Sequence, residues 1–129
     1  MNLALRFGMA ASLAVSSISH ALLYLHGYSH IPVVGPGFLL QSSVLGAIAV
    51  LIAAGGPGWL WVVAMLTSAG SLIAFSLSRT VGLFGFVERG WQPAPHAVIS
   101  LVAELVTVGV FFTAVFRSRT SPSLVSRTR

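Results

Sequence analysis

The chain has 129 residues, of which 56% are hydrophobic and only 7% are charged. A soluble domain carries about a quarter charged residues and still exposes about a third of the surface of its unfolded chain, so a water-soluble fold is not expected. The formal net charge is +5, but most of the arginines stand together in residues 117–129, without interleaved aromatic residues. A nucleic-acid partner is therefore not expected either. The absence of cysteine excludes disulfides and thiolate metal sites.

Four predominantly apolar stretches follow one another along the chain. They cover residues 5–25, 37–54, 59–78 and 96–116, and each approaches the length of about 20 residues that a helix needs to cross a bilayer. The sequence therefore predicts an all-α integral membrane four-helix bundle with short loops. Residues 1–116 form its single transmembrane domain, and residues 117–129 form a basic, disordered cytoplasmic tail.

The connections between these stretches differ in length and character. Residues 26–36 contain Gly27, Pro32, Gly35 and Pro36 and are predicted to form a loop. Residues 55–58, Gly-Gly-Pro-Gly, are predicted to form a tight turn that makes the second and third helices a hairpin. The last connection runs to Pro95 and is the longest.

This last connection is rich in aromatic residues and glycine. Aromatic side chains prefer the level of the lipid headgroups, so the segment is predicted to be interfacial or shallowly re-entrant. Its characteristic residues are Phe84, Phe86, Glu88, Arg89 and Trp91.

The arginines predict an orientation in the cell membrane. With both termini cytoplasmic, the inner side holds Arg6 and the tail arginines Arg117, Arg119, Arg127 and Arg129, whereas the outer side holds only Arg79 and Arg89. Five arginines against two favour this arrangement by the positive-inside rule. An alternative remains, because Arg6, the following apolar run and Ser19-His20-Ala21 also resemble a signal peptide that would leave three spans.

Glu104 is the most informative residue, because it lies about 12 Å of helix rise inside the fourth span. A carboxyl group at that depth is expected to be protonated or paired within the bundle. His20, Gln41 and Arg79 occur at matching depth, and His96, Ser100 and Glu104 follow one face of the fourth helix. The sequence thus predicts a polar intramembrane cluster. Its members are Glu104, His20, His96, Gln41 and Arg79.

The first span also carries a row of small residues, spaced four apart, that ends in His20. The row consists of Ala4, Gly8, Ser12 and Ser16. Small faces let helices approach closely in lipid, so we interpret the row mainly as a packing surface.

No cofactor is predicted, although the histidines leave two alternatives. His26 and His30 have the spacing that suits a metal on a helix, but Gly27 and Pro32 argue against a regular helix there. A bis-histidine haem site formed by His20 and His96 is possible because the two residues lie in different predicted spans, and nothing in the spacing requires it.

Three short motifs are similar to those of uncharacterised small four-span membrane proteins of actinobacteria. They are HIPVVGPGFLLQ at residues 30–41, GLFGFVE at 82–88 and LVAEL at 101–105. The resemblance implies the four-span architecture and implies no activity.

Three hypotheses on function follow. Because the chain lacks extramembrane mass and catalytic signatures, the first is a non-enzymatic homo-oligomer or accessory subunit of a larger membrane complex in the lipid bilayer. The second is a transporter or proton-relay element that uses Glu104. The third is a haem or metal binder.

Overall fold

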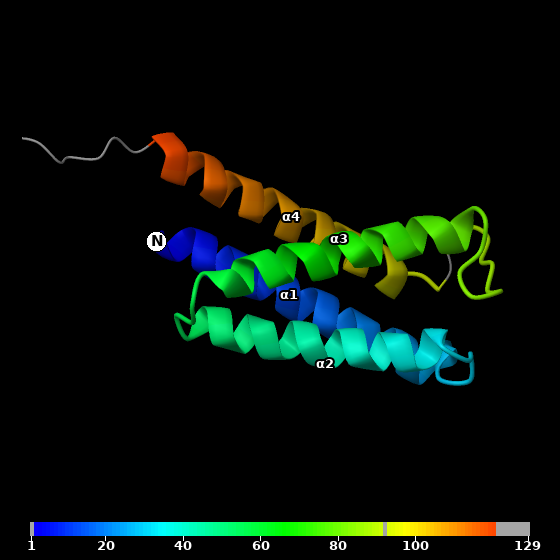
Figure 1. Cartoon of the computed structure of the whole chain (residues 1–129). Helices are drawn as coiled ribbons and strands as arrows, with labels where there is room; N and C mark the ends of the chain where they lie inside the picture. The colour runs from blue at the N-terminus through cyan, green and yellow to red at the C-terminus, as the bar shows by residue number, and fades with distance from the viewer. Residues whose placement is uncertain (1, 92, 121–129) are drawn as a thin grey trace, which may run out of the picture.

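The computed structural model describes residues 2–91 and 93–120. These residues contain four long α-helices, as Figure 1 shows: α1 (Leu3–Leu23), α2 (Val34–Ala53), α3 (Trp59–Arg79) and α4 (His96–Thr120). Each helix is long and apolar enough to cross a membrane. The prediction of an all-α chain with four apolar helices is therefore confirmed, and the helices indicate a multi-pass membrane protein.

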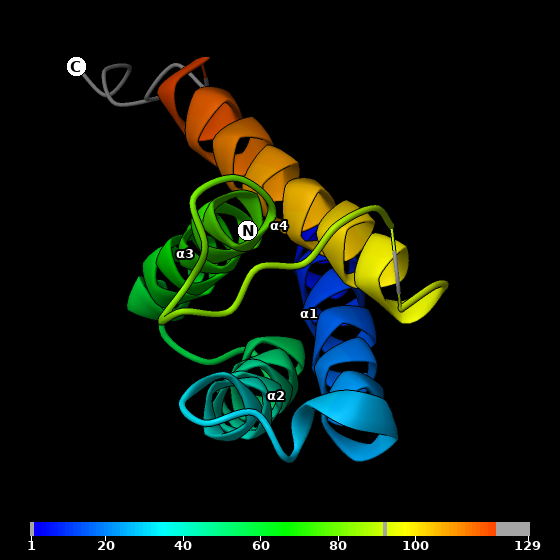
Figure 2. The same ribbon diagram turned by 90° about the vertical axis from the view of Figure 1, so that its right-hand side faces the viewer.

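The helices pack around α1, which lies between α2 and α4 (Figure 2). α3 packs mainly against α4, whereas α2 and α3 make few contacts with each other and diverge from their shared turn (Figure 1). We call the end with this turn, Asn2 and the last turn of α4 the hairpin end. The opposite end, with residues 29–33, 80–91 and 93–95, is the loop end.

The apolar core fills the half of the bundle toward the hairpin end. It is built from fully or almost fully buried side chains of α1, α2 and α3, including Met9, Leu13, Leu45, Ile52 and Leu60. Large apolar side chains elsewhere on the helices face outward, such as Leu40 and Val50, which are 66% and 68% exposed. Such exposure along every helix suits contact with lipid and not with water.

The loop predicted at residues 26–36 is shorter in the structure. α1 is followed by a π-helical turn, η1 (Tyr24–Tyr28), in which the backbone leaves helical geometry at His26 and Gly27, as the predicted loop requires. α2 begins at Val34, so residues 29–33 connect the turn to α2. The prediction placed Gly35 and Pro36 in the loop, but both lie in the first turn of α2. Proline is accepted there because the first turn of a helix has no intrahelical partner for its backbone nitrogen.

The turn predicted at residues 55–58 is confirmed. Gly55 ends α2 in a left-handed conformation with φ +86°, which glycine adopts without strain. The amide of Gly56 donates to the carbonyl of Leu51 at 2.8 Å, and that of Gly55 donates to Ile52 at 3.0 Å. These two bonds form a Schellman motif, which ends the helix and reverses the chain.

The connection between α3 and α4 contains a two-residue turn. Leu83 and Phe86 exchange backbone hydrogen bonds of 2.8 and 2.9 Å, and Phe84 and Gly85 between them have φ of +50° and +80°. Positive φ at both central residues is the geometry of a tight β-hairpin turn. The segment passes over the loop end of the bundle (Figure 2), and its interfacial or re-entrant position in a bilayer stays a prediction.

α4 is longer than predicted. The span was predicted to end at residue 116, but the helix continues to Thr120 and includes Arg117 and Arg119. The remaining part of the predicted tail, residues 121–129, lies outside the described residues.

Candidate functional site

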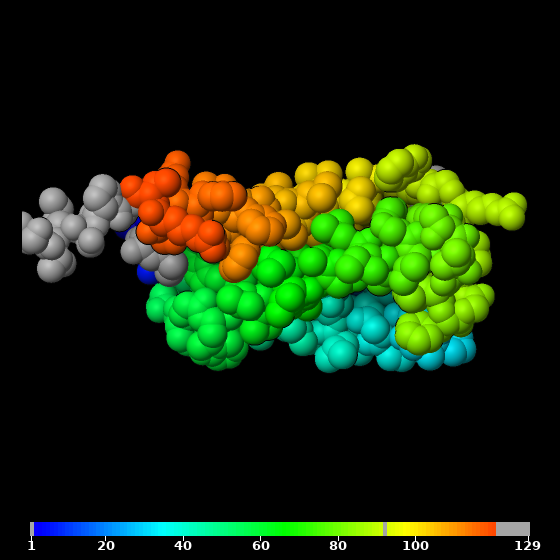
Figure 3. All heavy atoms as spheres, turned by 45° about the horizontal axis from the view of Figure 1, so that its top comes forward, coloured from blue at the N-terminus to red at the C-terminus, as the bar shows by residue number. Residues whose placement is uncertain are grey.

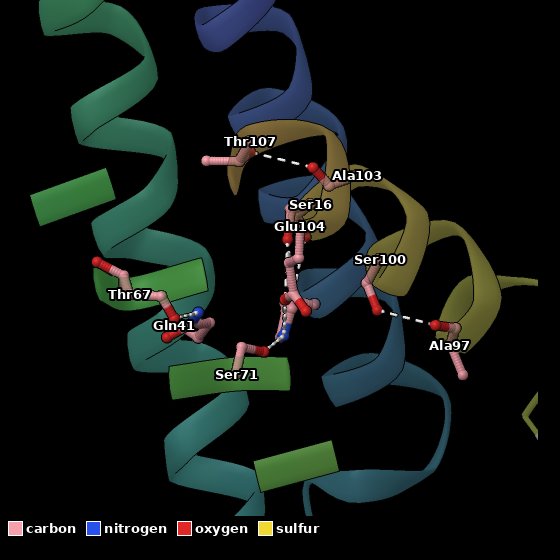
Figure 4. Close-up of polar contacts among 10 residues, drawn as sticks. Ser16, Gln41, Thr67, Ser71, Ala97, Ser100, Ala103, Glu104 and Thr107 are labelled. Atoms are coloured by element: carbon pink, nitrogen blue, oxygen red, sulfur yellow. Dashed lines mark hydrogen bonds and ion pairs between the residues drawn. The ribbon is translucent and has the colours of Figure 1, made fainter. Parts of the chain in front are cut away.

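Glu104 and His20 form a buried pair in the middle of the bundle. The carboxyl group of Glu104 on α4 lies with its Oε1 3.5 Å from Nε2 of His20 on α1, and the two residues are 2% and 5% exposed. Ser16, one turn before His20, donates its hydroxyl to Glu104 Oε1 at 3.3 Å. Figure 4 shows Ser16 and Glu104 side by side, with Ser71 reaching toward them from α3.

The hydrogen bonds of His20 define where its protons lie. Nδ1 is 2.9 Å from the carbonyl oxygen of Ser16, and because a carbonyl only accepts, Nδ1 carries the proton and donates it. In the neutral ring Nε2 is then the bare acceptor, so the proton between Nε2 and Glu104 belongs to the carboxyl group or makes the ring cationic. With one proton between them the pair has no net charge, and without that proton the neutral ring and the carboxylate carry one negative charge.

Hydroxyl groups extend the pair in two directions. Toward the loop end, Ser71 Oγ on α3 lies 3.4 Å from His20 Nε2. Toward the hairpin end, Ser12 on α1 and Thr107 on α4 are hydrogen-bonded to each other at 2.8 Å. Beyond Ser12, fully buried Met9 and the apolar core close the interior, so the polar row ends there.

A cavity of about 420 Å³ lies between α2 and α3 in the half of the bundle toward the loop end. Figure 3 shows α2 set back there beneath α3 and the connection that follows it. His20 lines this cavity and Glu104 does not. His20 therefore separates the buried carboxyl group from the open space.

A second polar group closes the cavity at the loop end. Arg79 Nη2 lies 3.2 Å from Glu88 Oε2, and the hydroxyl of Tyr28 donates to Glu88 Oε1 at 2.5 Å. Arg79 also donates to the carbonyl of Gly90. These contacts tie the connection after α3 to both α3 and η1. The sequence set Arg89 beside Glu88, but the structure pairs Glu88 with Arg79 and leaves Arg89 exposed.

The structure brings together some members of the predicted cluster and separates others. His20 and Glu104 are in contact, and Gln41 lines the same cavity while donating to the carbonyl of Thr67 at 3.4 Å. Arg79 lies at the rim and pairs with Glu88 instead of Glu104. His96 stacks on His26, with ring centroids 6.3 Å apart.

The histidines proposed for metal or haem have different surroundings. His26 Nδ1 donates to the carbonyl of Leu22 at 2.8 Å, and His30 is exposed in the following loop. The backbone leaves helical geometry at His26 and Gly27, so the two histidines do not share a regular helix. Within residues 2–91 and 93–120, no group of three His, Cys, Asp or Glu side chains is placed to hold a metal.

The aromatic residues of the predicted interfacial segment divide into two kinds. Phe84 and Trp91 are 75% and 63% exposed, whereas Phe86 packs edge-on against Tyr28 at 5.8 Å between ring centroids. The exposed pair suits a headgroup region. Phe86 instead packs inward, and both Phe84 and Phe86 line the cavity.

Three participants were not predicted: Ser71, Thr107 and Tyr28. Thr107 stands one turn after Glu104 on the same face, so the spacing that relates His96, Ser100 and Glu104 would have extended to it. No sequence pattern distinguishes Ser71 from the other serines of α3. Ser12 and Ser16 were interpreted as packing residues, and their hydroxyls contact Thr107 and Glu104.

No known protein family, curated protein or solved structure matches this chain. Its function is therefore inferred from its own residues. The resemblance to small four-span proteins of actinobacteria stays a prediction.

Proposed function

We propose that this chain is a small membrane protein in which Glu104 and His20 take up and release protons at the base of the cavity, as the central element of a transporter or proton relay. One observation carries the proposal: His20 contacts a buried carboxyl group at 3.5 Å and also lines a cavity of about 420 Å³. Ionisable residues within membrane spans commonly mark ion pathways and proton relays.

The geometry supports a defined order of proton transfer. Nδ1 of His20 is held by the Ser16 carbonyl, so Nε2 is the atom that exchanges protons. Nε2 faces both Ser71, which lines the cavity, and Glu104, which lies behind it. A proton entering from the cavity would therefore reach Glu104 through Ser71 and His20.

The hairpin end of this path is closed by apolar side chains. The hydroxyls of Ser16, Ser12 and Thr107 continue the row past Glu104, but Met9 beyond them is 0% exposed. The arrangement supports a half path that leads from Glu104 to the cavity in the half of the bundle toward the loop end. Passage to the other side would require α1 to move relative to α2 or α4.

Replacing the carboxyl group tests the proposal. We expect Glu104→Gln, reconstituted in liposomes, to lose the pH-dependent carboxyl band in infrared difference spectra and to reduce proton flux at least tenfold. His20→Gln should have the same effect on flux, because Nε2 is the exchanging atom. His30→Gln is the matched control, since it makes the same change on an exposed loop histidine outside the cavity. The proposal would be overturned if Glu104→Gln conducted protons as fast as the wild type and kept an unchanged carboxyl band.

A second candidate function has separate support. An apolar groove of about 440 Å³ runs between α1 and α4 and includes the small residues Gly8, Ala11 and Ala103. Grooves of this kind receive helices in membranes, which favours a homo-oligomer or accessory subunit. Cross-linking in native membranes tests it: a chain that stays monomeric, in mild detergent and after cross-linking, would contradict this candidate.

A further inference from the structure

We propose that the α2–α3 cavity binds an uncharged, lipid-soluble molecule whose flat ring head carries carbonyl or hydroxyl oxygens. The inference rests on the proposed function for what the Glu104–His20 pair does. The identity of the ligand class rests on the charge, the lining and the opening of the cavity.

The charges around the cavity balance within the protein. At the rim, Arg79 and Glu88 lie 3.2 Å apart and neutralise each other. At the base, His20 Nε2 and Glu104 Oε1 lie 3.5 Å apart and carry no net charge when one proton lies between them. A charged ligand would enter this low-dielectric space without a counter-charge, and burying an unpaired charge is unfavourable. The site therefore favours an uncharged molecule.

The lining combines aromatic rings with a few polar groups. Rings stack with offset or edge-on geometry at centroid distances of about 4.5–7 Å, and Tyr28 and Phe38 already lie 4.7 Å apart in this way. Gln41 uses one amide N–H on Thr67 and has a second N–H and a carbonyl oxygen. Five aromatic side chains line the cavity: Tyr28, Phe38, Phe75, Phe84 and Phe86. A flat ring with oxygens at its edge matches both features, and the volume falls within the usual range of about 300–1,000 Å³ for ligand sites.

The cavity opens sideways between α2 and α3. Gly37 on α2 and Gly70 on α3 both line it and are exposed, and a Cβ at either glycine would meet no heavy atom within 4 Å. Leu66, one turn before Gly70, also lines the cavity and is 60% exposed. Because the outer surface of these helices faces lipid, this opening admits a molecule with an apolar tail directly from the bilayer.

The glycines allow a steric test that spares the protein fold. We expect a naphthoquinone with a short isoprenoid tail to bind the nanodisc-embedded protein saturably, at about one molecule per chain. The double variant Gly37→Trp/Gly70→Trp should weaken this binding at least tenfold. Gly109→Trp is the matched control, because Gly109 is an exposed helical glycine, also without a heavy atom within 4 Å of its Cβ, that lines neither cavity nor groove. All variants should unfold at temperatures close to the wild type.

Three outcomes would overturn the inference. They are an absence of saturable binding above empty nanodiscs, equal binding by the double tryptophan variant, and equal or tighter binding of an analogue in which the ring bears a carboxylate. Glu104→Gln separates the two proposals, because Glu104 does not line the cavity. If the wild-type protein binds the quinone but exchanges no protons, only the proposed function is contradicted. If it exchanges protons but binds no quinone, only this inference is contradicted.

Discussion

Ser12 and Thr107 show how single hydroxyl groups join helices in this chain. Ser12 Oγ lies 2.9 Å from the carbonyl of Met9, Thr107 Oγ1 lies 3.0 Å from that of Ala103, and the two hydroxyls are 2.8 Å apart. Two protons serve these three contacts, because each hydroxyl donates once. One hydroxyl must therefore turn away from its own helix for α1 and α4 to be bonded, and the strength of that bond is a competition between two acceptors.

This competition predicts a small coupling energy. In a double-mutant cycle of Ser12→Ala and Thr107→Val, we expect a coupling of about 0.6 kcal/mol, and at most about 1.7 kcal/mol, as for other hydrogen bonds between membrane helices. The measurement is the free energy of unfolding in mixed detergent micelles. Thr113→Val serves as the control, because Thr113 is exposed and donates only to Gly109 in its own helix. A coupling clearly above about 1.7 kcal/mol would contradict this interpretation.

At the scale of the elements, the junction of η1 and α2 depends on one glycine. The π-helical turn and the loop of residues 29–33 bring the backbone of Tyr28 over the first turn of α2. A Cβ at Gly35 would lie 2.4 Å from the carbonyl oxygen of Tyr28 and 3.1 Å from that of Ser29. Backbone atoms cannot turn aside as a flexible side chain does, so the close approach requires glycine.

Two neighbouring glycines of α2 should consequently respond in opposite directions to the same change. Gly35→Ala is expected to lower the free energy of unfolding by about 1–3 kcal/mol, because of the clash with Tyr28. Gly37→Ala should raise it by about 0.5–1 kcal/mol, because alanine favours the helix and its Cβ meets nothing within 4 Å. Thermal unfolding followed by circular dichroism compares the two variants. Equal effects would show that the approach of Tyr28 to Gly35 is absent in the membrane.

Hydropathy predicted the four helices well, because helices in lipid must satisfy their own backbone hydrogen bonds. The sequence prediction failed at Val34–Pro36, where glycine and proline indicated a loop and the structure has the first turn of α2. Glycine and proline are also tolerated in the first turn of a helix. Composition alone does not distinguish these uses.

The candidate site was predictable only where the depth of a residue within its span identified it. His20 and Glu104 were identified because both are ionisable residues inside spans at matching depth. The partner of Arg79 was not, because pairing with Glu88 depends on how the connection after α3 folds back. Ser71 depends on the rotation of α3, which hydropathy does not determine.

At the scale of the whole molecule, the two ends of the bundle differ in packing and polarity. α1 lies at the centre and supplies His20, Ser16 and Ser12 to the polar row, so removal of this segment as a signal peptide would leave Glu104 without its partner. α2 and α3 diverge toward the loop end and leave the cavity there, whereas apolar side chains fill the hairpin end. The side of the membrane to which the cavity is nearer therefore depends on the orientation of the chain.

The arginines predict that orientation. Arg6 lies beside the turn at the hairpin end, since its Nη1 is 3.2 Å from the position of a Cβ at Gly55, and Arg117 and Arg119 stand at the end of α4. The positive-inside rule predicts that this end is cytoplasmic, which would place the cavity in the outer half of the bundle. The chain has no cysteine, and single cysteines report the two ends without background labelling. We expect a membrane-impermeant maleimide to label His30→Cys on intact cells, and to label Gly58→Cys only after permeabilisation. The reverse pattern would place the cavity, and the proton exchange proposed for Glu104 and His20, on the cytoplasmic side.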